Sequence, residues 1–341
     1  MKRSILLIWI LMLCFLASGT VRADEFDPYL MPWESADIGA ETREAGELRF
    51  YFMASEGYRM PDTNDEPEKW GDSCLVVFPN GELMLIDAGE TGYAPILVRN
   101  LERLGVKKID YLLISHPHSD HAGGAYAAGG VLDRFEVGRE FDNGSYNFNW
   151  DDPHYMEKAL EAHDVPREII SEGWTMDIGE VHLQVISPSS DVIGSLYTTT
   201  PDVNNSSIVL RMDYRNFSAL FTGDIYSLKE KELVRTRAEL LDVDLLKMPH
   251  HGNGTSNSKD FAKAVTPKLA VATGRLVIQD FNYYVYTMTG SKVLFDYCDG
   301  YIHVKTDGDA LEWDHSRERT IDYYDKYEYE TLMEKKNKQA D

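Results

Sequence analysis

The sequence has little cysteine and few cationic residues for its length. It contains 3 cysteines in 341 residues, and after residue 23 only Cys74 and Cys298 remain. The sequence leaves open whether these two form a disulfide or stay as separate thiols in the core. Its 34 lysines and arginines are outnumbered by 57 aspartates and glutamates, which gives a formal charge of −23. A surface this acidic repels nucleic acid and anionic membranes unless a metal or a local basic patch offsets it.

Long apolar runs are also scarce. After residue 23, no stretch approaches the roughly 20 apolar residues that span a bilayer. Residues 1–23 begin with cations, continue with an apolar run over 5–17 and end in Val-Arg-Ala, which indicates a cleaved export signal. Cys14 would suit a lipoprotein, but the bulky residues before it disfavour lipid attachment. We therefore predict a secreted or extracytoplasmic protein, and losing the three cations of residues 1–23 would change its charge from −23 to −26.

The rest of the chain indicates one α/β domain over residues 47–316. An extended lead-in at 24–46 precedes it, and a charged, tyrosine-rich tail at 317–341 follows as either an added helix or a frayed end. Asn80-Gly81 between two apolar runs predicts a β-hairpin. Apolar spacing predicts strands at 47–54, 109–116, 135–141, 181–187, 207–213, 218–224, 244–249 and 269–274, and helices at 94–105, 155–163, 227–241 and 258–267.

A histidine cluster follows the predicted strand at 109–116. The segment "SHPHSDHAGG" places within six positions the side chains of His116, His118, Asp120 and His121. In an extended segment, residues two apart face the same way, so His116 and His118 can share one metal. The glycines that follow help the chain to turn and to aim Asp120 and His121 at a second point nearby. Imidazole and carboxylate are ligands that zinc prefers when sulfur is absent, and such a cluster is rare as a structural accident.

Later strands end in the same kinds of side chain. Asp224 ends "ALFTGD", and a histidine pair follows "LLKMP". We predict that Asp224 bridges two metals and that His250 binds the second metal, although Asp224 would also suit a helix N-cap. Neighbouring side chains on an extended segment diverge, so we assign His251 to proton transfer or to support of the ligands. Asp87, in "LIDAG", either orients the cluster or simply forms a turn.

These motifs, in this order, resemble the metallo-β-lactamase superfamily, and the flanking segments resemble the hydrolase-like domain of ComEC-type competence (DNA-uptake) proteins. The matching stretches cover most of residues 70–275 and include "WGDSCLVVFPNGELMLIDAGE" and "LLKMPHHGNGTSNSKDFAKAVTPKLAV". The resemblance implies an αββα sandwich with two mixed β-sheets, helices on the outer faces and metals at one edge. It also implies hydrolysis, usually of phosphodiesters. We expect this chain to be the hydrolase-like part alone, without the membrane channel usually linked to such a domain.

The chain departs from the superfamily pattern in two places. Many members carry a third histidine for the first metal where this chain has "PDVNNSSIVL" with Asn204, so that metal is left with His116, His118, Asp224 and solvent. Relatives also carry a late histidine-containing loop, where this chain has "RLVIQDFNYYVYTMTG". The tyrosines of that segment either line a substrate pocket or pack within a strand.

The sequence therefore predicts an exported, metal-dependent hydrolase that uses a metal-bound hydroxide, with two Zn²⁺ ions or, alternatively, Mn²⁺. Asp120 would bind one metal and orient the nucleophile, and His251 would donate a proton to the leaving group. The acidic charge favours a small or cell-envelope phosphoester over DNA. The alternatives are a lactonase, thioesterase or β-lactam hydrolase of the same superfamily, and a non-catalytic metal-containing binding protein.

Overall fold

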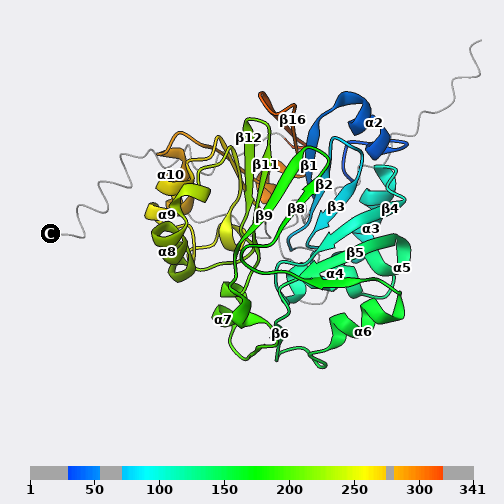
Figure 1. Ribbon diagram of the computed structural model, residues 1–341. Coiled ribbons are helices and arrows are strands. Elements are labelled where there is room, and N and C mark those ends of the chain that lie inside the picture. The colour runs from blue at the N-terminus through cyan, green and yellow to red at the C-terminus, as the bar shows by residue number, and fades with distance from the viewer. Residues whose placement is uncertain (1–29, 54–70, 274–279, 318–341) are drawn as a thin grey trace, which may run out of the picture.

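A computed structural model describes residues 30–53, 71–273 and 280–317. The predicted export signal and all but the first residue of the predicted tail lie outside these ranges. Two β-sheets pack face to face between two layers of helices, which Figure 1 shows on the left and right of the molecule. This is the αββα sandwich that the resemblance implies, and the prediction of fold class is confirmed. Within the described residues, no helix is both long enough and apolar enough to span a bilayer.

The first sheet has the strand order β17-β16-β1-β2-β3-β4-β5-β7. Neighbours from β17 to β3 are antiparallel, and those from β3 to β7 are parallel, so the sheet is mixed. The strands span Leu48–Phe52 (β1), Cys74–Val77 (β2), Leu83–Ile86 (β3), Lys108–Leu113 (β4), Glu136–Asp142 (β5), Arg167–Ile169 (β7), Ile302–Thr306 (β16) and Leu311–His315 (β17).

The second sheet repeats this plan with the order β15-β14-β13-β12-β11-β9-β8. Its half from β8 to β12 is antiparallel, and its half from β12 to β15 is parallel. The strands span Thr175–Ile178 (β8), Val181–Ser187 (β9), Val209–Tyr214 (β11), Phe217–Phe221 (β12), Leu245–Lys247 (β13), Leu269–Ala272 (β14) and Lys292–Phe295 (β15). Two short strands, Tyr146–Asn147 (β6) and Leu196–Tyr197 (β10), form a separate parallel pair.

Helices cover the outer faces of both sheets (Figure 1). Those on the first-sheet side are Ile38–Ala45 (α2), Ala94–Arg103 (α3), Ser119–Tyr126 (α4), Val131–Arg134 (α5) and Tyr155–Ala162 (α6). Those on the second-sheet side are Ser227–Thr236 (α8), Lys259–Val265 (α9) and Asp280–Thr287 (α10). Shorter helical segments are Thr91–Tyr93 (η1), Ser190–Val192 (η2), Thr200–Asn205 (α7), Ala238–Leu240 (η3), Pro249–Gly252 (η4) and Asp296–Asp299 (α11).

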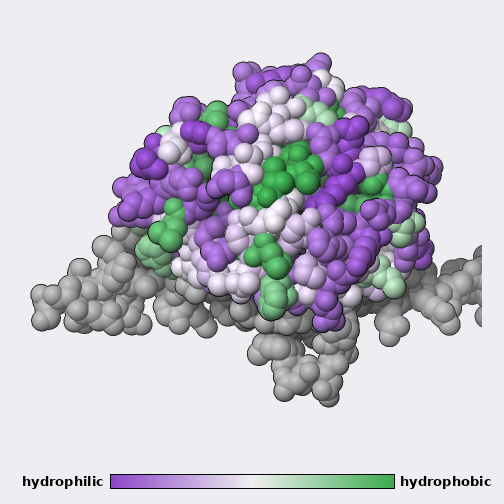
Figure 2. All heavy atoms as spheres, turned by 60° about the horizontal axis from the view of Figure 1, so that its bottom comes forward, coloured by the Kyte–Doolittle hydropathy of each residue, from purple (hydrophilic) through white to green (hydrophobic). Residues whose placement is uncertain are grey.

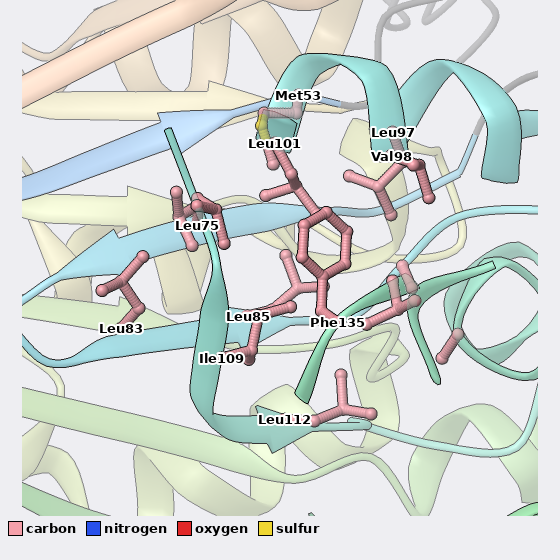
Figure 3. Packing of buried hydrophobic residues seen from close by; sticks show 14 of the residues in the cluster. Met53, Leu75, Leu83, Leu85, Leu97, Val98, Leu101, Ile109, Leu112 and Phe135 are labelled. Carbon is pink, nitrogen blue, oxygen red and sulfur yellow. The ribbon is translucent and has the colours of Figure 1, made fainter. Parts of the chain in front are cut away.

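Strand alternation divides the apolar side chains among three cores. Along β2, Cys74 and Val76 pack between the two sheets, whereas Leu75 and Val77 pack under the helices of the first sheet. Figure 3 shows this second core, where Leu97, Val98 and Leu101 of α3 lie over strand residues such as Leu75 and Leu85. A third core lies beneath α8, α9 and α10. Each fully buried Leu or Val contributes about 1.5–3 kcal/mol to folding. Because the central strands bury such side chains on both faces, packing on both faces stabilises them.

The β-hairpin prediction is confirmed, because β2 and β3 pair with Cys74 opposite Ile86. The thiols of Cys74 and Cys298 are not joined in a disulfide. The expectation of an extended segment before the domain is wrong for α2. This helix starts where the Asp37 side chain accepts a hydrogen bond from the Ala40 amide, which is an N-cap arrangement.

The late tyrosine-rich segment forms the helix α10, so the alternative in which its tyrosines pack within a strand is wrong in the kind of element. Its Tyr286 is fully buried, and the tyrosine hydroxyl donates a hydrogen bond to Asn257 Oδ1 at 3.2 Å. Asn282, four residues earlier, donates from Nδ2 to the Gly252 carbonyl at 2.7 Å. Residues four apart share one helix face, so packing against the segment around Gly252 overrides the β-propensity of the tyrosines.

Candidate metal centre

The candidate site lies where strands of both sheets end at one edge of the sandwich. Parallel strands align their carboxyl ends, so the segments that follow β3, β4, β12 and β13 meet there. These segments carry most of the predicted site residues: Asp87 after β3, His116 and His118 after β4, Asp224 after β12, and His250 and His251 after β13. The fold therefore brings distant parts of the sequence together at this edge.

The histidine cluster continues into the first turn of α4. His118 is the N-cap residue of this helix, and Asp120 lies in its first turn, where a carboxylate is stabilised by the helix dipole. His116 Nε2 lies 3.0 Å from His118 Nδ1, so the two imidazoles converge. The rings of His116 and His121 are 4.1 Å apart between centroids. The three imidazoles of this cluster thus face one region.

Gly123 and Gly124 lie inside α4, not in the turn that the sequence predicts. A Cβ atom on Gly124 would lie 2.0 Å from the Ala88 carbonyl oxygen. One on Gly123 would lie 2.6 Å from the Thr91 amide nitrogen. Glycine is needed here because the helix packs directly on the loop that follows β3, which fixes the distance between that loop and the histidines.

Asp87 holds His121 and the start of the histidine loop. Its Oδ2 lies 2.8 Å from His121 Nδ1 and accepts a hydrogen bond from Ser115 Oγ at 2.8 Å. Its Oδ1 accepts from the Ser115 amide at 2.7 Å. A carboxylate bound to one imidazole nitrogen fixes the ring and leaves the other nitrogen to face a metal. This geometry corresponds to the predicted orienting role of Asp87.

Asp224 is the carboxylate around which the histidines gather. Its Oδ2 lies 3.2 Å from His251 Nε2, 3.3 Å from His121 Nε2 and 3.8 Å from His250 Nε2. Its backbone amide donates to Ser207 Oγ at 3.0 Å, which ties it to the segment before β11. Asp224 is not an N-cap of α8, because that position is taken by Tyr226.

Both histidines of the "HHG" segment face Asp224, and the expectation that they diverge is wrong. That expectation assumes an extended backbone. In the structure, His250 and His251 have φ values of +47° and +56°, and Gly252 has +77°. His251 Nε2 also lies 3.2 Å from Asp120 Oδ2. His250 lies nearer the surface, with a side-chain exposure of 15% against 9% for His251, and its Nδ1 lies 2.5 Å from Thr255 Oγ1.

Two further residues belong to this centre that are not among the predicted site residues, Asp72 and Lys247. Asp72 Oδ1 lies 3.4 Å from His251 Nδ1 and accepts a hydrogen bond from the Thr273 hydroxyl. Lys247 Nζ forms an ion pair with Asp72 Oδ2 and lies 3.6 Å from Asp224 Oδ1. The predicted hairpin contained one signal for Asp72. Asp72 lies just before β2, and β2 is antiparallel to β3, so β2 begins at the edge of the sheet where β3 ends.

The charges of the centre divide it into two parts. Burial alone would raise the pKa of Asp224, but the imidazoles of His251 and His121 outweigh it and hold that pKa well below its usual range. Burial would lower the pKa of both these imidazoles, yet the carboxylates, Asp224 first, raise it well above its usual range. Burial lowers the pKa of His116 and of His118. The surroundings of Asp224 thus favour added positive charge, and the other two histidines favour the neutral, metal-binding form.

Donor atoms of four residues fit a divalent metal. One atom from each lies within 4.8 Å of all the others, and the residues are Asp72, His121, Asp224 and His251. The buried Nε2 of His121 makes no hydrogen bond in the described structure, although it faces Asp224. Imidazole nitrogens and carboxylate oxygens at this spacing suit zinc. His116 and His118 lie beside this group, with the rings of His116 and His121 4.1 Å apart between centroids. The second ion and the assignment of individual ligands stay predictions.

The asparagine segment that replaces the expected third histidine borders the same site. Asn204 is 1% exposed. Burial lowers the pKa of His118 and raises that of Tyr226, and hydrogen bonding by the Asn204 side chain opposes both changes, so Asn204 lies against both residues. Asn205 accepts a hydrogen bond from the Tyr226 amide at 2.9 Å, which fixes this segment beside the loop after β12.

The chain belongs to the metallo-beta-lactamase superfamily, whose family model matches residues 69–272. This agrees with the two mixed sheets, the outer helices and the metal-type side chains at one edge.

Among individual proteins, the chain is similar to competence protein ComA of Neisseria gonorrhoeae, with 31% identity over 207 residues, covering 60% of this chain and 25% of ComA. It is also similar to ComE operon protein 3 of Bacillus subtilis, with 26% identity over 218 residues, covering 59% and 26% of the two chains. The chain thus spans about a quarter of the length of these relatives. The metallo-beta-lactamase fold protein YhfI from Bacillus subtilis matches with a TM-score of 0.48 and 12% identity, covering 73% of this chain and 96% of YhfI.

Proposed function

We propose that this protein is a metal-dependent hydrolase that cleaves a phosphoester, most suitably a phosphodiester, with two zinc ions. The observation that carries the proposal is the convergence on Asp224 Oδ2 of three imidazoles from two separate segments, the start of α4 and Pro249–Gly252, at 3.2, 3.3 and 3.8 Å. Clustering buried carboxylates with imidazoles in this way is costly unless the site binds a cation. The superfamily membership supports the same conclusion.

We assign the roles of the two "HHG" histidines in the reverse of the order that the sequence favours. His251 contacts three carboxylates and is the deeper of the two, so we propose it as a metal ligand. His250 lies at the rim, and Thr255 holds its Nδ1, which leaves Nε2 to transfer a proton to a leaving group. A bound divalent cation would supply the Lewis acidity that activates water and offsets negative charge on the substrate.

Asp120 suits the predicted role of orienting the nucleophile. Burial would raise its pKa, but the imidazoles of His121 and His251 outweigh this and lower it, so the side chain remains a carboxylate that can accept a hydrogen bond from water. Its position in the first turn of α4 holds it beside both imidazoles.

The charge of the chain supports a small substrate. The formal charge is −23, and the lysine at the site, Lys247, is buried. Long single-stranded DNA normally needs a basic groove with stacking aromatics. Hydrophilic residues predominate on the face that Figure 2 shows, and apolar residues form separate groups there. We propose a small phosphoester or a phosphorylated component of the cell envelope, in keeping with the proposed export of the chain.

Nucleic acid is the second candidate substrate, because two relatives are a competence protein and a ComE operon protein. Purified protein would be tested for metal content and then for turnover of bis(p-nitrophenyl) phosphate, single-stranded DNA, a lactone and a cephalosporin. We expect bis(p-nitrophenyl) phosphate to be hydrolysed faster than the other three substrates. Faster turnover of the lactone or cephalosporin would reject the phosphoester assignment, and metal without turnover of any substrate would favour a binding protein.

A pair of variants tests the site itself. His116→Ala should reduce metal content and activity together, because His116 is buried within the histidine cluster. His182→Ala is the matched control, since His182 is an exposed residue of β9 paired with Asp177. A His116→Ala protein with full activity and full metal content would contradict the proposed site.

A further inference from the structure

The carboxylates of the candidate metal centre outnumber its fixed cations. Four of them contact its histidines, and they belong to Asp72, Asp87, Asp120 and Asp224. Across residues 30–53, 71–273 and 280–317, the only ion pairs between these carboxylates and a lysine or arginine are those of Lys247. Buried carboxylates without a partner are costly. The ammonium of this single lysine therefore supplies the permanent positive charge of the centre.

Lys247 contacts one oxygen of each of two carboxylates. Its Nζ pairs with Asp72 Oδ2, lies 3.6 Å from Asp224 Oδ1 and donates to the Gly223 carbonyl at 3.2 Å. The opposite oxygens face His251: Asp72 Oδ1 lies 3.4 Å from its Nδ1, and Asp224 Oδ2 lies 3.2 Å from its Nε2. The lysine thus orients both carboxylates so that one oxygen of each remains directed into the cage.

The ammonium is enclosed by protein. The Lys247 side chain is 5% exposed. It lines a cavity of about 20 Å³ between the sheets, which has room for about one water molecule. Phe52, Leu113 and Phe221 form part of the apolar wall of this cavity. With so little water available, the carboxylates and the carbonyl must hold the lysine in this position.

We propose that Lys247 is a built-in counter-cation of the metal centre. It keeps Asp72 and Asp224 in their binding positions when no metal is bound, and its charge repels a divalent cation and so limits metal affinity. The cage is therefore formed before metal binds, and metal adds less to stability than it would to an uncompensated cluster of carboxylates. This inference rests on the proposed function only in taking the centre to bind a divalent cation.

The test compares metal-free and zinc-saturated Lys247→Met, which keeps an unbranched side chain without the charge. We expect the melting temperature of the metal-free variant to fall by about 10 °C or more, because two buried carboxylates lose their cation. Saturating zinc should restore most of this loss, and zinc affinity measured by chelator competition should rise at least about tenfold. Lys268→Met is the control, because Lys268 is 65% exposed where it pairs with Asp244.

A double variant makes the result independent of general packing. Asp72→Asn with Lys247→Met removes one charge of each sign, so the metal-free protein should recover at least half of the lost melting temperature. Equal losses with and without zinc, together with unchanged zinc affinity, would mean that the lysine only fills space and would overturn the proposal. If Lys247→Met folds in neither state, the double variant decides: folding supports the proposal, and failure to fold rejects it. If the wild-type protein hydrolysed no substrate, the proposed function would be rejected. The proposal for Lys247 would still stand, since melting temperature and zinc affinity require only metal binding.

Discussion

We expect Asn257→Ala to destabilise the protein and to weaken metal binding, although Asn257 lies outside the metal centre. This residue is fully buried and holds the segment Pro249–Gly252 that presents the histidine pair. Its Nδ2 donates to the Pro249 carbonyl at 3.0 Å and to the Asn253 carbonyl at 3.1 Å, and its Oδ1 accepts from the Tyr286 hydroxyl at 3.2 Å. The strained backbone of the pair depends on these contacts.

The expected cost follows from the contacts that alanine cannot make. Each of the three hydrogen bonds contributes about 1 kcal/mol, since its partner group is left in the interior. Asn257 also has φ +66°, a left-handed conformation. Alanine pays about 1 kcal/mol there, whereas asparagine tolerates it better. The free energy of unfolding should therefore fall by about 4 kcal/mol.

Guanidinium denaturation of metal-free protein measures this loss, and Asn257→Gly is the matched variant. Glycine loses the same hydrogen bonds but accepts the left-handed backbone, so it should be more stable than alanine by about 1 kcal/mol at most. Zinc affinity should fall about tenfold in both, because relaxed histidine backbones no longer converge on one carboxylate. A loss below about 1 kcal/mol, or zinc affinity equal to wild type in both variants, would refute the reasoning.

Three further outcomes follow from other contacts. Gly124→Ala should lose metal binding and about 3 kcal/mol of stability or more, by thermal unfolding, because its Cβ would lie 2.0 Å from the Ala88 carbonyl oxygen. Asp87→Asn should weaken zinc binding about 10- to 100-fold in a chelator titration, since His121 loses the carboxylate that orients it. Burial raises the pKa of Glu140 well above its usual range, so the folded state keeps a proton that the unfolded chain loses above about pH 4.3. Glu140→Gln should therefore raise the melting temperature increasingly from about pH 4.3 upward and leave it unchanged below, and a constant difference across pH would contradict this.

The sandwich could be predicted from local pattern together with the family resemblance. The apolar runs around Asn80-Gly81 form the predicted hairpin. Its strands are buried on both faces, so continuous apolar runs are enough to identify them in the sequence. The histidine segment of residues 116–121 was equally visible, since several ligand-type side chains lie close in sequence. Patterns of this kind are contained within a single segment.

Other features depend on contacts between segments, and sequence pattern misjudged them. The tyrosines of residues 283–286 have high β-propensity, yet they lie in α10. What decides the helix is that Asn282 and Tyr286 meet two different parts of the segment 252–257 from one helix face. Propensity describes a residue in isolation, and it yields where several buried contacts require the other conformation.

The metal centre shows the same distinction in its charges. The alternation rule would send His250 and His251 apart, but both take left-handed backbones that turn the rings onto Asp224. In the sequence, Lys247 does not stand out from the other lysines. Its role depends on the carboxylates of Asp72 and Asp224, which come from distant segments. A lone lysine in a strand of aliphatic residues is costly to bury unless an anionic side chain pairs with its ammonium group. The lysine of "LLKMP" therefore indicates a buried anionic partner, and in the structure that partner is Asp72.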